Sequence, residues 1–170
     1  NQGTLWLGTY FGGVNYFNPE YEIYTRYSYS SNEKKGLSNP VVGRTIEDKN
    51  GNLWIGTEGG GLNYYNRRTR EFKWYRPQEG RNSISHNNVK ALYYDADKEI
   101  IWIGTHLGGL NKLDIRSGHF THYRMEGNNP QSLPSDIIRD ITPYKDLLII
   151  ATQNGVCLFN PANGQCRQLF

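Results

Sequence analysis

Long apolar runs, helical periodicity and an excess of charge of one sign are all missing from this 170-residue sequence. No apolar run approaches the roughly 18 residues that a helical membrane span needs. The formal net charge is only +3, and the basic pairs Lys34-Lys35 and Arg67-Arg68 fall in expected turns, where charges are ordinarily solvated. We therefore expect no nucleic-acid partner and no membrane contact by this segment.

The sequence is also poor in the residue patterns that carry chemistry. Its two most promising histidines, His86 and His106, have no cysteine or carboxylate at the spacing of a metal site. No Ser-His-Asp arrangement or paired carboxylates are visible. The triplet 59–61 is all glycine, but no helix and no Lys-Ser/Thr pair follow it, so it is a turn and not a phosphate loop. We expect no catalytic residue, metal or cofactor in this segment, and hence no enzyme activity in it.

A five-residue motif of the form Leu-Trp-Ile-Gly-Thr is the main positive feature. It stands at 5–9, 53–57 and 101–105, with a divergent copy, Leu-Ile-Ile-Ala-Thr, at 148–152. The copies are 48, 48 and 47 residues apart. A fixed period in the forties indicates an array of similar supersecondary units.

Each unit consists of short stretches rich in aromatic and β-branched residues, divided by turn pairs such as Asn-Gly and Gly-Gly. The predicted strands are 41–48, 53–57, 62–66 and 71–76, then 89–95, 101–105, 110–114 and 119–124, then 137–142, 147–152, 156–160 and 165–170. The first unit lacks its first strand. The fold class is therefore all-β, with β-propeller blades of four antiparallel strands at 4–27, 41–76, 89–124 and 137–170.

Three full blades and three strands of another amount to about 3.75 blades, and propellers have about four to eight. We expect this chain to be part of a seven- or eight-bladed ring, with a self-closed four-bladed ring as the alternative. The open faces at its two ends are expected to meet either remaining blades or a second copy, and two copies would make a closed ring of eight.

The repeated positions are expected to serve the scaffold. The tryptophans of the motif are predicted to pack between blades, and its glycines to make room for a large neighbour; these are Trp6, Trp54, Trp102, Gly8, Gly56 and Gly104. Trp74 occurs once, on an outer strand, where it covers the sheet or meets a partner. Cys157 and Cys166 lie on neighbouring strands, as two buried thiols or as a disulfide.

Several motifs together resemble the regulator-propeller repeat of bacterial two-component sensors. They include Asn87-Asn88-Val89, Gly51–Thr57, Gly60-Gly61-Leu62 and Ser132-Leu133-Pro134-Ser135, and the likeness extends over the whole chain. The resemblance implies a periplasmic sensor region of a hybrid sensor histidine kinase of Bacteroidetes type, which detects oligosaccharides. The kinase would lie outside this chain. No signal peptide is present, an absence without weight if the chain is part of a longer protein.

The expected binding rim is the edge that carries the long inter-blade segments 28–40, 77–88 and 125–136. The residue after each motif threonine lies on this rim and differs in every copy, unlike the motif itself. These residues, together with His86, are the candidate ligand-binding set: Tyr10, Glu58, His106, Gln153 and His86. Aromatic faces, donors and acceptors suit an oligosaccharide or another small ligand. A protein-interaction scaffold, or a lyase that uses the same rim, are the alternatives.

Overall fold

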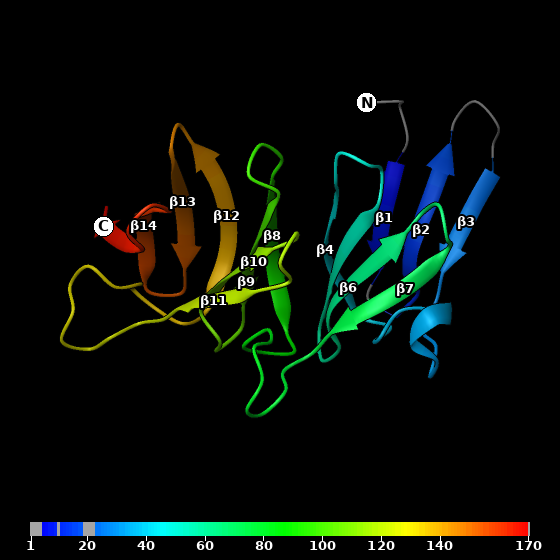
Figure 1. Ribbon diagram of the computed structural model, residues 1–170, viewed down its shortest axis with the longest axis horizontal. Helices are drawn as coiled ribbons and strands as arrows, with labels where there is room; N and C mark the ends of the chain where they lie inside the picture. Colours follow the sequence, from blue (N-terminus) through cyan, green and yellow to red (C-terminus); the bar gives the residue numbers. More distant parts are fainter. Residues whose placement is uncertain (1–4, 10, 19–22, 170) are drawn as a thin grey trace.

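The computed structural model describes residues 5–9, 11–18 and 23–169, and within them fifteen strands form four antiparallel sheets (Figure 1). Each sheet follows the chain order of its strands. Blade 1 contains β1 (Leu5–Thr9), β2 (Gly13–Asn18) and β3 (Ile23–Tyr27). Blade 2 contains β4 (Val42–Glu47), β5 (Leu53–Thr57), β6 (Gly61–Asn66) and β7 (Glu71–Tyr75).

The last two sheets repeat the plan of blade 2. Blade 3 contains β8 (Val89–Asp95), β9 (Ile100–Thr105), β10 (Leu110–Asp114) and β11 (Phe120–Tyr123). Blade 4 contains β12 (Ile138–Tyr144), β13 (Leu147–Thr152), β14 (Gly155–Asn160) and β15 (Gln165–Gln168). The all-β fold built from four-stranded propeller blades is confirmed. The 3-10 turn η1 (Glu33–Lys35) was not predicted from the periodicity.

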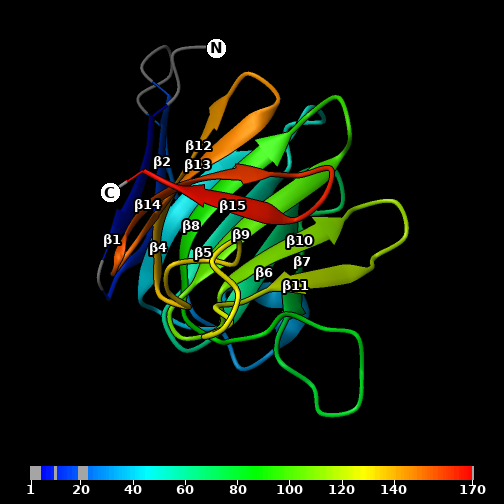
Figure 2. The same cartoon turned by 90° about the vertical axis from the view of Figure 1, so that its left-hand side faces the viewer.

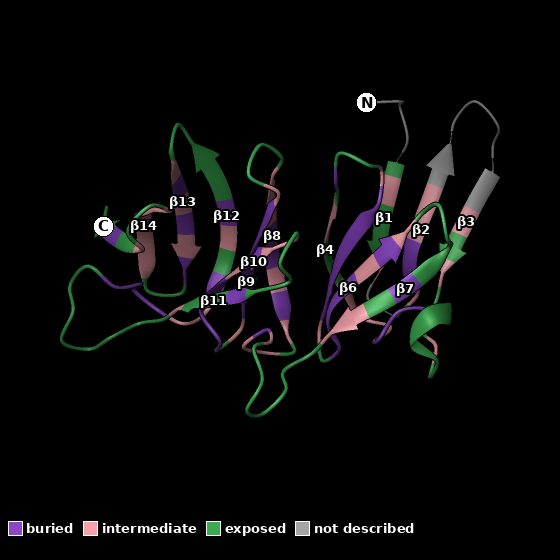
Figure 3. Ribbon diagram, in the orientation of Figure 1, coloured by how far each residue is buried: buried purple, intermediate pink, exposed green. Residues whose placement is uncertain are grey.

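Neighbouring blades stack through their first strands and bury a separate core in each junction. β4 packs on β8 and β8 on β12, and the turned view shows the sheets one behind another (Figure 2). Burial is greatest in β5 and β9, which carry the repeated motif (Figure 3). Trp54 and Trp102 are each only 1% exposed. Trp54 belongs to a core shared with Val89 of blade 3, and Trp102 meets Phe159 of blade 4 edge-on, so their predicted role between blades is confirmed.

The glycine of the motif is required by the next blade. A Cβ atom on Gly56 would lie 2.6 Å from Cγ1 of Val89, and one on Gly104 would lie 2.5 Å from Cγ2 of Ile138. Both neighbours are fully buried at the start of the following first strand. The absent side chain therefore admits a large apolar residue, as predicted.

The threonine of the motif closes the turn that follows it. In all four blades its hydroxyl donates to the carbonyl oxygen of a glycine that begins or directly precedes the next strand, over 2.8–3.0 Å. These threonines are Thr9, Thr57, Thr105 and Thr152. The hydrogen bond satisfies the threonine hydroxyl, which is buried in blades 2, 3 and 4. This explains why the divergent fourth copy of the motif also has threonine.

A buried asparagine joins the inter-blade segment to the third strand. Asn63 accepts from the backbone N–H of Ser38 and donates to its hydroxyl, each over 2.8 Å. Asn111 makes the same two bonds with Ser85. Blade 4 has Cys157 in place of the asparagine, and there the preceding segment has Pro134, which offers no N–H. The loss of the donor explains why a thiol is tolerated.

Trp74 covers the sheet, and Cys157 and Cys166 are two buried thiols; in each case this is the first of the two predicted roles. Trp74 donates its indole N–H to the carbonyl oxygen of Gly36 over 2.9 Å and lies beneath the Arg76 guanidinium, so it covers the segment beside η1. Cys157 and Cys166 are buried and unbonded, with their sulfur atoms 2.9 Å apart in a thiol hydrogen bond.

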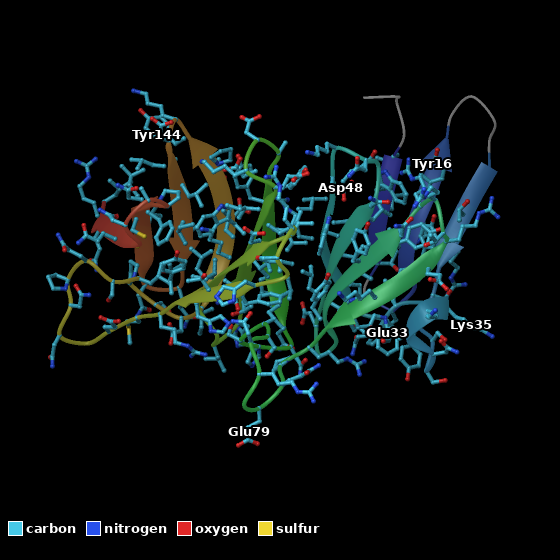
Figure 4. The ribbon with its side chains drawn as sticks, viewed as in Figure 1. Tyr16, Glu33, Lys35, Asp48, Glu79 and Tyr144 are labelled. Carbon is cyan, nitrogen blue, oxygen red and sulfur yellow. The ribbon has the colours of Figure 1, made fainter. Side chains whose placement is uncertain are left out.

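The two ends of the blades differ, as the strand alternation predicts. Glu33, Lys35 and Glu79, from the long inter-blade segments, lie at one end of the molecule, and Asp48 and Tyr144, from or beside the turns between first and second strands, lie at the other (Figure 4). The end with the long segments is called the loop rim below, and the other end the turn rim.

Candidate functional site

The backbone fixes the candidate residues on the loop rim in the same way in each blade. The N–H groups of Glu58, His106 and Gln153 donate to the carbonyl oxygens of Val41, Asn88 and Ile137, over 2.9–3.0 Å. Glu58 and His106 also form isolated β-bridges to the start of the next blade. Each side chain therefore starts from an equivalent place on the rim, although the residue types differ. Tyr10 lies outside the described residues.

Two of these side chains are held by cations that the sequence reading missed. Glu58 forms an ion pair with Lys90 of the next blade; 35% of the Glu58 side chain and 27% of the Lys90 side chain are exposed. Gln153 accepts from Arg139 over 2.8 Å. Lys90 and Arg139 occupy the same register position, one residue after the start of β8 and of β12.

A β-bulge explains why these cations reach the rim. The pairing of β8 with β9 shifts between Val89 and Ala91, and that of β12 with β13 shifts between Ile138 and Asp140. The extra residue in each shift is Lys90 or Arg139. Bulges re-aim a side chain away from the regular alternation, so the strand period alone did not place these residues beside the candidate set.

The two histidines lie at the junction of blade 3 with the loop rim. His86 accepts the Asn88 N–H on its Nδ1 over 3.0 Å. Burial, followed by the charges of His106 and Arg124, lowers the pKa of His86 below its ordinary value. His106 Nδ1 is buried and has no hydrogen-bond partner among the described residues. His106 is thus near enough to His86 to lower its pKa, whereas Glu58 is paired with Lys90 and Gln153 with Arg139.

Exposed apolar residues flank this polar row. Phe11 is 73% exposed and Leu107 is 56% exposed. Leu107 has a φ of 77° at the position where blade 2 has Gly59 with a φ of 100°. A branched residue in this left-handed region is strained and is retained mainly where structure or function demands it. The rim therefore offers apolar contact surface beside its donors and acceptors.

Within the described part of the chain, no group of three or more His, Cys, Asp or Glu side chains is arranged to hold a metal ion. Among the same residues, no helix has the length and apolar character needed to cross a membrane.

Two segments of the chain match the family described as two component regulator propeller. The matches cover residues 36–59 and 83–106, each running from an inter-blade segment through the first two strands of a blade. These two segments are similar to regulator propeller repeats. Both repeats include the motif tryptophan, glycine and threonine and a candidate rim residue, Glu58 or His106.

Solved structures that resemble the chain include extracellular domains of bacterial proteins. The extracellular domain of a hybrid two component system from B. thetaiotaomicron matches all of the chain with a TM-score of 0.83 and 26% identity. That of a one component system from the same organism matches all of it with a TM-score of 0.79 and 24% identity. The chain covers 23% and 24% of these two proteins.

A third similar structure comes from a different system. PorZ of Porphyromonas gingivalis, a surface component of the type-IX secretion system, matches 99% of the chain at a TM-score of 0.70 and 20% identity. The chain covers 26% of PorZ, so it spans about a quarter of the length of each of the three structures. The likeness to PorZ is one of fold alone. Among curated proteins, no sequence matches the chain.

Proposed function

We propose that this chain is a ligand-sensing part of an extracytoplasmic, periplasmic propeller of a hybrid two-component sensor, and that its loop rim binds an oligosaccharide. The proposal rests on the contrast between a repeated backbone arrangement and varied side chains along the loop rim. The backbone holds Glu58, His106 and Gln153 in equivalent places, yet their side chains differ in charge and in hydrogen-bonding capacity. Positions freed from a common packing task are available for recognition.

The surroundings of these residues supply what a carbohydrate needs. The Glu58–Lys90 and Gln153–Arg139 pairs present donors and acceptors together. Leu107 adds an exposed apolar face next to His106. Pyranose rings offer both hydroxyl groups and apolar C–H edges, so a rim that alternates polar pairs with apolar side chains matches both parts of the ligand.

Signalling would follow from a difference in affinity between two arrangements of the sensor. A ligand shifts an equilibrium only by as much as it prefers one state. We propose that an oligosaccharide bound on the loop rim favours one arrangement of the propeller and its neighbours, and that this change reaches a histidine kinase outside this chain. In this proposal the segment itself performs no catalysis.

A glycan array followed by calorimetric titration of the bound oligosaccharides tests the proposal. The variants His106→Ala, Glu58→Ala and Gln153→Ala each remove one rim side chain, and Tyr10→Ala removes the side chain of the remaining candidate of this set. Hydrogen bonds to charged groups contribute about 1.5–3 kcal/mol, so we expect at least one variant to bind roughly tenfold to a hundredfold more weakly. Lys98→Ala is the matched control, because Lys98 pairs with Asp95 on the turn rim.

Each other result points to a different function. Saturable binding that survives all four rim substitutions would place the site elsewhere. No glycan binding by the folded protein would favour a protein-interaction scaffold. Cleavage products detected by chromatography would indicate a propeller lyase.

A further inference from the structure

A cavity lies between blades 1 and 2, on the side of the turn rim. It has a volume of about 400 Å³ and is lined by Trp6, Tyr16, Thr25, Tyr27, Tyr65, Arg67 and Arg70. That volume falls within the range of roughly 300–1,000 Å³ that is usual for small-molecule sites. None of these residues belongs to the loop rim, so the cavity is separate from the site proposed above.

The inner wall of the cavity is aromatic and rich in hydroxyl groups. Trp6 packs on Tyr16 with ring centres 4.6 Å apart, and Tyr27 packs on Tyr65 at 4.7 Å. Burial and a hydrogen bond with Tyr65 raise the pKa of Tyr27, which keeps this phenol protonated and neutral. Three tyrosines and Thr25 therefore line one space beside the Trp6 indole ring. This combination suits a ligand with apolar C–H edges and many hydroxyl groups.

Two guanidinium groups form the outer wall. Arg67 lies over the Trp6 ring at 5.3 Å and is 3.6 Å from the Glu47 carboxylate. Arg70 makes no salt bridge within the described residues. The charge of Arg67 is thus partly balanced, whereas that of Arg70 is free to meet an anion. Carboxylates and sulfates accept paired hydrogen bonds from guanidinium groups.

Arg70 stands where blades 3 and 4 have glycine. Its φ is 59°, and the matching turn positions are Gly118 with a φ of 72° and Gly164 with a φ of 75°. An arginine in this left-handed region is strained relative to glycine. Arg67 is likewise replaced by Ile115 and Pro161 in the equivalent turns. The fold of the turn therefore requires neither Arg67 nor Arg70. Arg70 lines the cavity although its backbone conformation is strained.

We propose that this cavity binds a sugar residue that carries an anionic group, with the ring against the aromatic wall and the anion at Arg70 and Arg67. The shared chemistry is a carboxylate or a sulfate ester on a polyhydroxylated ring. The site does not depend on ligand binding at the loop rim. It adds selectivity for acidic glycans on the opposite face of the same blades.

Calorimetric titration with three probes tests this site. Trigalacturonate carries carboxylates, a chondroitin sulfate disaccharide carries a sulfate ester, and maltotriose is neutral. We expect saturable binding of the first, the second or both, at least tenfold tighter than maltotriose. The probe that binds more tightly identifies the anion.

Two substitutions in the same turn make the test specific. Arg70→Gly removes the guanidinium and installs the residue found in blades 3 and 4, so the variant is expected to melt at the same or a higher temperature while losing at least tenfold in affinity. Arg68→Gly makes the same charge change in the same turn, but Arg68 does not line the cavity, and its affinity should stay within twofold of the original. Equal losses in the two variants, equal binding of maltotriose, or no binding by any probe would overturn the proposal. Loop-rim variants such as His106→Ala should leave this binding unchanged, which separates the two sites.

Discussion

His86 shows how one side chain can serve the scaffold and also make stability depend on pH. Its Nδ1 accepts the N–H two residues ahead, as Asn39 does for Val41 and Ser135 for Ile137. Each of these residues lies three residues before the first strand of its blade. The acceptor is therefore a structural requirement, whereas the ability to take up a proton is peculiar to His86.

We expect the folded protein to lose stability as pH falls through about 6.5, the ordinary histidine value. Burial, with the neighbouring His106 and Arg124 charges, lowers the pKa of His86 in the folded state. The unfolded chain then binds more protons in this window, so the free energy of unfolding decreases toward acid. His86→Asn keeps the acceptor, as Asn39 does, and removes the titrating group.

Urea denaturation of the original protein and of His86→Asn, at about pH 7.5 and about pH 5.5, measures the effect. The variant should lose less stability between the two pH values. His119→Asn is the control, since His119 is exposed. An unchanged pH dependence in His86→Asn would show that His86 does not couple folding to protons.

Sequence reasoning at the residue scale succeeded where a side chain repeats and failed where the backbone departs from regularity. Trp54 and Gly56 recur in register, and the repetition itself indicates a common packing task. Lys90 and Arg139 reach the loop rim only because of bulges, and Arg70 reaches its cavity only because a turn adopts a left-handed conformation. Neither the bulges nor the left-handed turn residue changes the spacing of apolar residues in the sequence.

At the scale of the element, the first strand of one blade limits the size of the side chains in the second strand of the blade before it. The side chain of Ile138 occupies the space that a Cβ on Gly104 would take, at 2.5 Å. We expect Gly104→Ala to lower the free energy of unfolding by about 1–3 kcal/mol, as overpacked cores do. Urea denaturation monitored by tryptophan fluorescence gives this value.

Ala151 provides the matched control, because it occupies the same position in blade 4. Ala151→Gly should cost only about 0.5–1 kcal/mol, the usual cost of a glycine within a strand. If Gly104→Ala proved no more destabilising than Ala151→Gly, the space beside Gly104 would not be needed for packing against the next blade. The strands themselves could be read from the sequence, since turn residues and the 48-residue spacing bound them closely; β12 ends two residues beyond its predicted limit.

At the scale of the whole molecule, the exposed apolar residues at the ends of the array call for a neighbour. Leu5 and Leu7 on β1 are 51% and 47% exposed, although the equivalent Leu53 and Ile55 in blade 2 are fully buried. Leu169, at the other end of the array, is 38% exposed. We propose that these ends stack on further blades of a seven- or eight-bladed ring, which a second copy supplies when the 170 residues are isolated.

Light scattering at micromolar concentration should then give a mass near twice the 19.6 kDa of one chain, because two copies offer eight blades and close a ring. Leu7→Lys places a charge on the stacking face and should shift the mass toward that of one chain. Leu107→Lys is the control: Leu107 is similarly exposed, at 56%, but lies on the loop rim, so its variant should still pair. A monomeric mass for the unsubstituted chain, or equal loss of pairing in both variants, would contradict end-to-end stacking. Open ends could be predicted from the sequence, because the strands of each repeat can be counted. Ring size could not be predicted, because it depends on the angle between neighbouring blades, which no residue pattern reports.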